Sequence, residues 1–532
     1  MSNEDANAVQ HAGLSHSAVV IGGGITGLAT AGLLAREGYT VTLLEKQPAV
    51  GGRAGLWESQ GFRFDTGPSW YLMPEVFDHF FRLMGTSAFD QLDLVRLDPG
   101  YRVFFEGEPQ PIAITSDRQE NIDLFESLEP TSGLRLSRYL DSATDTYEMA
   151  KKRFLYSTFE SFRPLLRWDV LKRLPTLARL LLQSLDRRAA GTVRDDRLRQ
   201  ILGYPAVFLG SSPFTTPSMY HLMSHLDMTD GVYYPMGGFT TIIDRIATLA
   251  TDAGVEIRTS SAVDRIVVDD GKVTGVQFAD GNYLAADLVV STADLHHSET
   301  QLLPEKYQTY PEKYWRSRVS GPGAMLLYLG VEGDLPKLEH HTLLFARDWR
   351  ANFDAIFGAE TRIPDTASLY ICKPSGVDPA VAPEGHSNVF VLVPIPADPS
   401  LTDLDSLGDR VIDQIAEWVG IPDLASRIVL RRTVGPADFE RDLNAWKGSA
   451  LGPAHVLKQS AFFRGTNKSR KVEGLLYAGS SSIPGIGLPM CLISAELVIK
   501  RLRGDTSTEA LPEPAVASAM RDERRTDTER AS

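Results

Sequence analysis

Three closely spaced glycines near the N-terminus can bind the phosphates of a nucleotide. Gly22, Gly24 and Gly27 follow the short apolar run Ser17–Ile21, and the apolar stretch after them has the composition of a helix that stops at Gly38. Gly22 permits a tight turn, Gly24 lets a pyrophosphate approach the backbone, and Gly27 lets helix and strand pack closely. The helix N-terminus then offers its free N–H groups to the anion.

An acidic residue and an arginine follow at positions that suit the rest of a dinucleotide. Glu45 ends a second apolar run about 20 residues after Gly22, where a carboxylate accepts hydrogen bonds from a ribose and disfavours a 2′-phosphate. Arg53 follows the glycine pair Gly51 and Gly52, and its forked cation suits a pyrophosphate that needs charge neutralisation. The pattern predicts a βαβ unit with a dinucleotide other than NADP.

The composition excludes several classes of protein. The chain has 532 residues, 43% of them hydrophobic and 23% charged, which indicates a folded protein of roughly two or three domains. A net charge of −14 argues against a protein that coats nucleic acid, so no nucleic-acid partner is expected.

We expect no metal site. Two cysteines, Cys372 and Cys491, are too few for a disulfide framework or for a Cys-based zinc or iron–sulfur site. The adjacent pairs His296–His297 and His340–His341 suggest metal ligands, but neighbouring side chains on a strand point to opposite faces.

These motifs resemble the two-dinucleotide-binding flavoproteins, the superfamily of amine oxidases and phytoene desaturases. Residues 64–70, followed by Met73 and Pro74, are similar to the bacterial phytoene desaturases, in which this loop lies beside the flavin ring. The resemblance implies FAD as the cofactor. It also implies that Gly67, Pro68 and Ser69 contact it.

A second glycine-rich loop near the C-terminal end carries the same resemblance. Residues 475–479 predict a last buried strand and residues 489–503 a helix with proline at its first position. In the family this loop aims the helix N-terminus at the flavin pyrimidine edge, where it stabilises the anion of the reduced ring. The resemblance implies contacts from Gly479, Gly485 and Gly487.

Three details of the cofactor site remain open in the sequence. The resemblance places the backbone around Val263 against the adenine. The family usually carries Thr-His-Pro-Gly where this chain has Ser-Ser-Ile-Pro-Gly at residues 481–485, so any role of that histidine is absent or changed. Cys491 could attach a flavin covalently, although a buried helix cysteine with noncovalent FAD is the preferred interpretation.

The resemblance covers residues 18–503 and implies an α/β fold. It implies a Rossmann-like FAD domain, an inserted mixed α+β substrate domain and a helical membrane-contact region. We expect disorder in 1–15, an FAD domain in 16–95, 231–300 and 436–504, a substrate domain in 96–230 and 301–435, and a disordered tail in 505–532.

Residues 151–190 differ from the rest of the chain. They hold ten basic and three acidic residues, interleaved with leucines and Trp168. A basic amphipathic helix with tryptophan predicts contact with a membrane surface, whereas a solvated helix packed on its leucines is the alternative. No signal peptide and no run of about 18 apolar residues stands out, so we expect a cytoplasmic protein peripherally associated with the membrane.

The resemblance implies an FAD-dependent phytoene desaturase. Such an enzyme removes two hydrogens across a C–C bond flanked by alkenes, cycle after cycle, and converts phytoene through its desaturated intermediates toward lycopene. Oxygen or a quinone would reoxidise the flavin, and the sequence names no catalytic acid or base. Alternatives are a carotenoid ketolase, a carotenoid isomerase, a shorter-chain diapophytoene desaturase, an amine or porphyrinogen oxidase, and a non-enzymatic prenyl-binding protein of the dissociation-inhibitor type.

Overall fold

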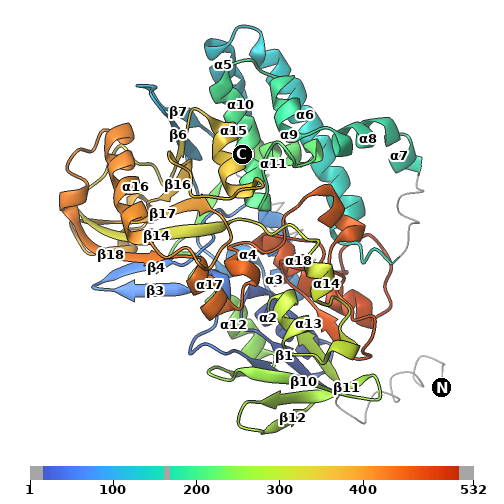
Figure 1. Ribbon diagram of the computed structural model, residues 1–532. Helices are drawn as coiled ribbons and strands as arrows, with labels where there is room; N and C mark the ends of the chain where they lie inside the picture. Colours follow the sequence, from blue (N-terminus) through green and yellow to red (C-terminus); the bar gives the residue numbers. More distant parts are fainter. Residues whose placement is uncertain (1–15, 161–167, 515–532) are drawn as a thin grey trace, which may run out of the picture.

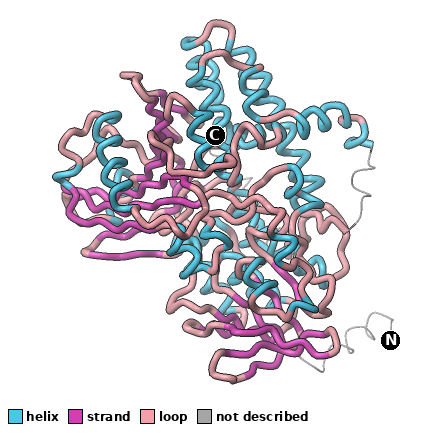
Figure 2. Tube along the Cα trace, in the orientation of Figure 1, coloured by secondary structure: helices cyan, strands magenta, loops and turns pink. Residues whose placement is uncertain are grey.

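The structure is a computed structural model, and it describes residues 16–160 and 168–514 (Figure 1). Its two larger sheets lie in different parts of the molecule, and a group of helices caps the end opposite the first sheet (Figure 2).

The first sheet is parallel and is built from segments far apart in the sequence. Its central strand β1 (Ser17–Ile21) lies between β2 (Thr40–Leu44) and β13 (Leu288–Ser291). The edges are β9 (Glu256–Arg258) and β19 (Leu475–Tyr477), so the order is β19-β13-β1-β2-β9. Strands β1, β2 and β19 lie at positions where the sequence predicts strands.

Three helices pack on this sheet and on one another. They are α2 (Ile25–Arg36), α12 (Thr240–Asp252) and α18 (Leu488–Leu502), and their buried faces join β1 and β2 in the largest hydrophobic core. A three-stranded antiparallel sheet of β10 (Val263–Asp269), β11 (Lys272–Phe278) and β12 (Tyr283–Ala285) lies at the lower end in Figure 1.

The second large sheet has seven strands in the order β18-β14-β17-β16-β15-β6-β7. The strands are β6 (Tyr101–Phe105), β7 (Ile112–Ile114), β14 (Gly323–Glu332), β15 (His341–Phe345), β16 (Leu369–Cys372), β17 (His386–Ile395) and β18 (Ile428–Val434). Helix α16 (Leu404–Val419) buries its apolar residues in the same core as β14 and β17. We call this the substrate-side sheet, because its strands lie in the residues that the sequence predicts to form the substrate domain.

The helical cap carries the segment that the sequence marks as basic and apolar. Its helices include α5 (Arg118–Leu128), α6 (Ser132–Ala150), α7 (Trp168–Leu171), α8 (Leu174–Leu182), α9 (Leu185–Ala190) and α10 (Asp196–Gly203). The expected single amphipathic helix over 151–190 is therefore several short ones in the described part, and residues 161–167 lie outside it. Among the described helices, none combines the length and the apolar character that a membrane crossing requires.

The end of the chain differs from the prediction over residues 505–514. Leu511 is buried in the main core, and its N–H donates to Glu496 of α18. The Lys500 ammonium donates to the carbonyls of Ser507 and Glu509. These residues are ordered because a buried cation holds their carbonyls. Residues 1–15 and 515–532, for which we expect disorder, lie outside the described residues.

The remaining short elements connect these layers. They are β3 (Leu56–Ser59), β4 (Phe62–Asp65), α3 (Pro74–Leu83), α4 (Ala88–Gln91), β5 (Leu94–Arg96), η5 (Ser218–Leu222), α11 (Met223–His225), the π-helical turn η6 (Leu226–Asp230), β8 (Tyr233–Pro235), α13 (Leu295–Thr300), α14 (Glu312–Trp315), α15 (Trp349–Phe357), α17 (Pro436–Leu443), η12 (Leu457–Gln459) and η13 (Ala461–Phe463).

Candidate functional site

The glycine turn between β1 and α2 leaves one side open to a ligand. Gly22 has a φ of +102°, and a Cβ atom on Gly27 would lie 1.8 Å from the Gly22 carbonyl oxygen, so the turn and the packing of α2 require these two glycines. Gly24 is extended, with φ −73°. A Cβ atom there would meet only the Gly51 carbonyl oxygen at 3.9 Å. The protein alone therefore tolerates a side chain at Gly24, whereas a closely bound pyrophosphate would not.

The second glycine pair lies directly beside the first turn. The Gly51 N–H donates to the Gly23 carbonyl at 2.8 Å, and Gly24 and Gly51 form an isolated bridge. Two glycine backbones thus form one surface at the N-terminus of α2, where N–H groups can bind an anion. We call this surface the cradle.

Glu45 is buried beside the cradle and holds its backbone. Its carboxylate accepts hydrogen bonds from the Gly23 N–H at 2.6 Å and from the Gln47 N–H at 2.7 Å. Each oxygen keeps a free lone pair, so the carboxylate can still accept from ribose hydroxyls. The Ser261 N–H donates to the Glu45 carbonyl at 2.8 Å, which brings the chain just before Val263 next to Glu45.

Arg53 lies near the cradle but points along the C-terminal segment. Its guanidinium donates to the carbonyls of Ala450 at 2.9 Å and Ser449 at 3.5 Å. It is close enough to lower the pKa of the Cys491 thiol, although burial dominates and raises that pKa overall. Arg53 therefore lies between the cradle and the first turn of α18.

The loop from Gly67 to Ser69 packs on the backbone of Arg53. A Cβ atom on Gly67 would lie 2.2 Å from the Arg53 carbonyl oxygen, so only glycine permits this approach. Pro68 follows, half-buried, and the Ser69 hydroxyl lies 2.6 Å from the Tyr370 hydroxyl. Gly67 and Ser69 line a cavity together with Phe64, Asp65, Tyr234, Cys372, Pro374, Asn388 and Phe390.

The C-terminal glycine loop reaches the same place from the other side. A Cβ atom on Gly479 would lie 3.6 Å from the Thr26 hydroxyl of α2, and Gly487, with φ +119°, precedes α18. The structure therefore brings together the glycines of the first turn, Glu45, Arg53, Gly67–Ser69 and the Gly479–Gly487 loop. Val263 is half-buried at the edge of this group.

Sequence reasoning missed two buried side chains that fix the C-terminal loop. The His455 Nε2 accepts from the Ile486 N–H at 3.2 Å, and its Nδ1 lies 2.9 Å from the Tyr220 hydroxyl. Burial and the Arg464 cation lower the pKa of His455 well below its usual range, so this imidazole is neutral. His455, which lies outside residues 480–487, thus contacts the loop in which the histidine usual for the family is missing.

Arg464 is the second of these residues. Its guanidinium is buried and donates to the carbonyls of Ser480 at 2.5 Å and Ser482 at 3.1 Å, while burial lowers its pKa to about 10. No sequence motif around His455 or Arg464 predicts that these side chains contact residues 480–487.

An aromatic cluster is centred on Trp70, which directly follows the Gly67–Ser69 loop; we call this loop, which lines the cavity, the cavity loop. The Trp70 ring stacks on His341 with centroids 4.3 Å apart and planes 9° apart. It also contacts Tyr101, Tyr204 and Phe208 at centroid distances of 5.5, 6.3 and 5.3 Å. Tyr101 and Tyr204 are buried in this cluster, whereas Trp70 and Phe208 are only partly buried. The part of these two rings that remains exposed suits an apolar, conjugated ligand better than a polar one.

A buried carboxyl group lies within this aromatic cluster. Asp227, on the π-helical turn η6, accepts hydrogen bonds from Tyr204 at 2.8 Å and Tyr101 at 3.1 Å, and its Oδ1 has no hydrogen-bond partner. Burial raises the pKa of this carboxyl to about 6. The sequence gives no signal for it, because its importance comes from burial alone.

Comparison with known proteins agrees with this geometry. Residues 25–499 match the family described as flavin containing amine oxidoreductase. A carotenoid 3,4-desaturase of Haloarcula japonica is 42% identical, over 91% of this chain and 98% of the relative. A zeta-carotene-forming phytoene desaturase of Myxococcus xanthus is 35% identical, over 91% of this chain and 93% of the relative.

A solved structure shows the same fold. An oxidoreductase from Methanosarcina mazei superposes with a TM-score of 0.63, at 18% identity, over 91% of this chain and 100% of that one. At this identity the likeness supports the mixed α/β architecture and nothing finer.

The chain is an FAD-dependent oxidoreductase. It belongs to the family of flavin-containing amine oxidoreductases, which matches nearly its whole described length. The predicted cofactor, the resemblance to carotenoid desaturases and the enzyme class, an oxidoreductase of CH–CH bonds, are confirmed. The cradle, with space at Gly24 and a carboxylate at Glu45, fits a dinucleotide.

Proposed function

We propose that the protein is a carotenoid desaturase. The observation that carries this proposal is the similarity to carotenoid desaturases along nearly the whole chain. Two features of the structure support it: the cradle suits a dinucleotide, and the cavity loop runs directly into the aromatic cluster around Trp70. A polyene would find in that cluster the apolar surface it needs.

We propose the following residues as the FAD site. FAD supplies a two-electron acceptor when it is bound. The glycine turn and the N-terminus of α2 would bind its pyrophosphate, Glu45 the ribose, and Arg53 would contribute positive charge. The proposed set is Gly22, Gly24, Gly27, Glu45, Arg53, Gly67, Pro68, Ser69, Val263, Gly479, Gly485 and Gly487. The FAD domain of 16–95, 231–300 and 436–504 contains all of these residues.

Phytoene is the proposed substrate, with successive desaturations toward lycopene. A second candidate is desaturation at the 3,4 bond of a carotenoid that is already conjugated, because the Haloarcula relative is a carotenoid 3,4-desaturase. The two candidate activities differ in the first substrate that the enzyme accepts, so assays with phytoene alone and with lycopene alone distinguish them.

The direct test uses the purified FAD-loaded protein with liposomes that contain phytoene or lycopene. The flavin should bleach without oxygen when the true substrate is present, and its colour should return with oxygen or a quinone. Lycopene formed from phytoene supports the first proposal, and further desaturation of lycopene with phytoene untouched supports the second. An oxygenated or merely isomerised product would indicate a ketolase or isomerase, and bleaching by a polar amine alone would overturn the proposal.

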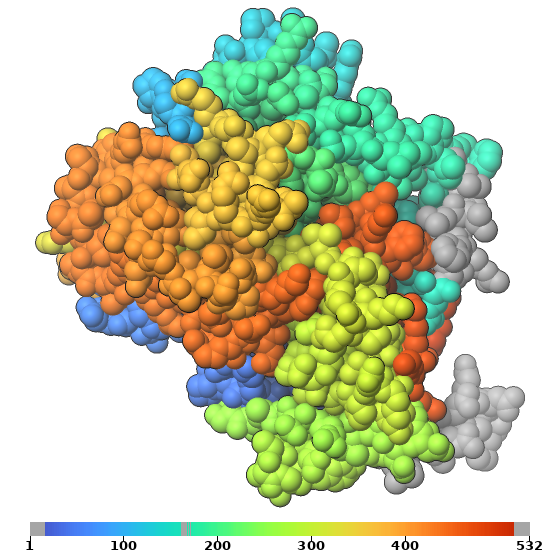
Figure 3. All heavy atoms as spheres, in the orientation of Figure 1, coloured from blue at the N-terminus to red at the C-terminus, as the bar shows by residue number. Residues whose placement is uncertain are grey.

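We propose further that the helical cap contacts a membrane surface. Several large apolar side chains of α7 and α8 are exposed: Trp168 at 70%, Leu174 at 51% and Leu182 at 81%. Lys172 and Arg179 are exposed in the same segment, which lies on the outer surface at the upper right of Figure 3. Exposed apolar groups interleaved with cations suit an anionic bilayer that holds a water-insoluble substrate.

Hydrogen bonds connect α8 through η5 to the segment before η13, a turn in which another large apolar side chain is exposed. The Ser218 N–H donates to the Gln183 carbonyl at 2.8 Å and the Ser218 hydroxyl to the Leu180 carbonyl at 3.1 Å, which tie η5 to α8. The Tyr220 hydroxyl in η5 donates to Ser460 at 3.4 Å, and Phe463 of the following turn η13 is 62% exposed.

Liposome flotation with a matched charge control tests the membrane proposal. Lys172→Glu with Arg179→Glu should reduce flotation on anionic liposomes, at about 1 kcal/mol per cation near the surface. Arg173 is a poorer target because it pairs with Asp145. Arg245→Glu with Lys313→Glu makes the same change of charge at exposed positions on α12 and α14 and should float normally. Equal flotation of both variants would remove α7 and α8 from the membrane proposal.

A further inference from the structure

Two histidines and a cysteine meet inside the substrate-side sheet. His340, His341 and Cys372 each offer one ligand atom, and these atoms lie within 4.8 Å of one another. All three residues are at most 5% exposed. Within residues 16–160 and 168–514, they are the one group of this kind. We call them the His–His–Cys cluster.

Strand register places His341 and Cys372 on one face. β15 and β16 are antiparallel, and His341 lies directly opposite Cys372. Side chains that are directly opposite in such a pair share a face of the sheet, with Cβ atoms about 5 Å apart. His340 precedes β15, so the alternation of a strand does not apply to it, and its ring lies 4.6 Å from the His341 ring. The expectation that the two histidines point apart is therefore wrong.

The cluster leaves several buried nitrogen atoms without partners. Nδ1 and Nε2 of His340 and Nε2 of His341 have no hydrogen bond, while Nδ1 of His341 lies 2.7 Å from the Tyr370 hydroxyl. An unsatisfied buried polar group costs about 1–3 kcal/mol and calls for an explanation, such as an ion.

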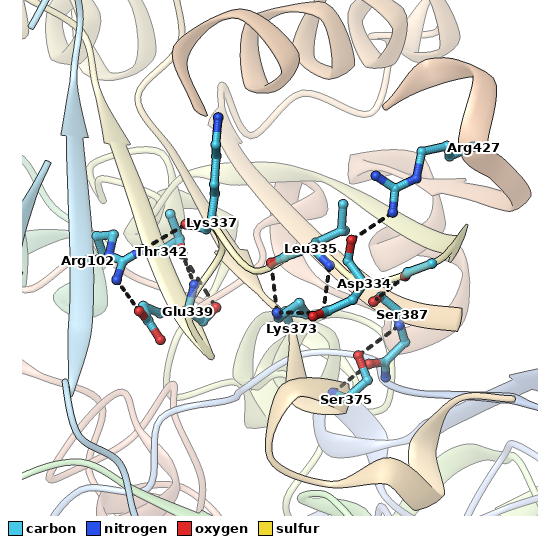
Figure 4. A network of polar contacts seen from close by, with 12 residues as sticks. Arg102, Asp334, Leu335, Lys337, Glu339, Thr342, Lys373, Ser375, Ser387 and Arg427 are labelled. Carbon is cyan, nitrogen blue, oxygen red and sulfur yellow. Dashed lines mark hydrogen bonds and ion pairs between the residues drawn. The ribbon is translucent and has the colours of Figure 1, made fainter. Parts of the chain in front are cut away.

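Polar contacts fix the residues on either side of the cluster. Figure 4 shows the buried Lys373 ammonium, which donates to the Leu335 carbonyl at 2.8 Å. The Lys373 N–H donates to the His340 carbonyl at 2.9 Å. Arg427 donates to the Asp334 carbonyl at 2.8 Å. The cation of Lys373 lies near the cluster, but Asp334 at 3.6 Å offsets its charge.

The cavity beside the cluster provides room for one more ligand. Cys372 lines this cavity with Ser69 and Tyr234. Three protein ligands with one open position are typical of a zinc site whose fourth ligand is water. Ligand atoms in a tetrahedral zinc site lie roughly 3.5 Å apart, given bonds of about 2.0–2.3 Å. Metal binding would therefore draw the three ligand atoms closer than their present span of 4.8 Å, and no hydrogen bond of the His340 ring has to break for that movement.

We propose that His340, His341 and Cys372 bind one Zn²⁺ ion, with a water from the cavity as the fourth ligand. Two imidazoles and a thiolate are a ligand set that zinc prefers. The ion would satisfy one nitrogen of His340 and Nε2 of His341, and it would join β15 and β16 at the wall of the cavity. Binding releases the thiol proton of Cys372, which becomes a thiolate on the metal.

The experiment uses the FAD-loaded full chain, purified with a tag that lacks histidine and then dialysed against Zn²⁺ and against buffer. Elemental analysis should find about one zinc per chain. X-ray absorption at the zinc edge should show one sulfur at about 2.3 Å and nitrogens at about 2.0–2.1 Å. Cys372→Ser and His341→Gln should each lower zinc content at least tenfold, whereas Cys491→Ser, which changes the other cysteine, should keep it.

Two results would overturn the proposal. One is wild-type protein without zinc after dialysis against Zn²⁺. The other is zinc with no sulfur ligand, or zinc retained by both variants. The absorption spectrum of the wild type decides even if a variant does not fold. Flavin content and phytoene turnover are measured in parallel, so failure of the desaturase proposal is separate from failure of the zinc site.

Discussion

The cradle at the end of β1 is formed mainly by backbone atoms, whereas the interior of the substrate-side sheet is formed by side chains. In the cradle, backbone atoms approach one another closely, and glycine is required because a Cβ atom on Gly27 would lie 1.8 Å from a carbonyl oxygen. In the substrate-side region, side chains such as His341, Tyr370 and Cys372 meet across strands. A site formed by the backbone requires glycines at fixed spacing, which the sequence shows. A site formed by side chains depends on strand register, which the sequence does not show.

This difference predicts opposite responses to substitution. A substitution in the cradle acts through steric contact, and the loss of stability or FAD binding depends on which atom the new methyl group meets. A change in the substrate-side region acts through hydrogen bonds and charge, and its size depends on pH and on which partner is left behind.

The largest expected effect comes from Gly27→Ala. The methyl group would collide with the Gly22 carbonyl, which belongs to the backbone and cannot move alone. We expect a loss of stability above about 4 kcal/mol, together with loss of FAD. Thermal unfolding and the flavin absorbance of the purified protein measure both.

Gly24→Ala is the matched control and sharpens the comparison. Its methyl group meets only one protein atom, at 3.9 Å, so the fold should persist. FAD binding should fall, because the methyl would occupy the space that we propose for the pyrophosphate. A Gly24→Ala protein that retains FAD normally would contradict our placement of the pyrophosphate.

Asp227→Asn tests the substrate-side region through pH. The pKa of Asp227 is raised to about 6, above about 3.9 in the unfolded chain, so the folded state holds a proton that the unfolded state releases. This contribution is complete below pH 4 and is lost as pH rises through 6, by up to about 3 kcal/mol. Unfolding by denaturant from pH 4 to 7 should show a decline in the wild type that the variant lacks. Equal pH slopes would show that Asp227 is not protonated at its site.

Glu45→Ala removes a carboxylate that serves the backbone and, as we propose, the ribose. It leaves the N–H groups of Gly23 and Gln47 without their acceptor. FAD affinity should fall by about 1–3 kcal/mol, measured by reconstitution of the flavin-free protein. Glu45→Gln, which keeps one acceptor oxygen, should lose less. Unchanged affinity in both variants would remove Glu45 from the site.

Tyr370→Phe should have the smallest effect. It removes the hydroxyl between Ser69 at 2.6 Å and His341 at 2.7 Å, at a cost of about 0.5–1.5 kcal/mol in stability. FAD affinity should change little, because among the described residues Ser69 is the one member of the proposed FAD site that hydrogen-bonds to this hydroxyl, and no residue of the cradle does. A large loss of FAD would show that the two regions are coupled more tightly than their construction suggests.

The sequence predicts the cradle well because the constraint is local. The turn at Gly22–Gly27, β2 and α18 all appear within a few residues of their predicted bounds. Glu45 follows from its distance along the chain, since a βαβ unit has a narrow range of lengths.

The sequence predicts poorly the contacts that join distant residues, in the substrate-side sheet and outside it, because they depend on burial and on where strands begin. The argument that His340 and His341 point apart fails since β15 begins at His341. His455 and Arg464 reach residues 480–487 from outside that loop, and Asp227 acquires its raised pKa only through burial. The ordered residues 505–514 depend on carbonyls that bind Lys500.

The strand order of the parallel sheet has a consequence for biosynthesis. The ribosome makes β1 first, whereas its neighbour β13 spans residues 288–291 and the edge strand β19 spans residues 475–477. At about 5–20 residues per second, roughly 20 to 90 s separate the first strand from the last. During that time the nascent chain exposes an unpaired apolar strand edge. If the Gly479–Gly487 loop contacts FAD as we propose, a complete flavin site forms only when translation is nearly finished, and the edge of β1 that pairs with β13 stays unpaired for most of that time.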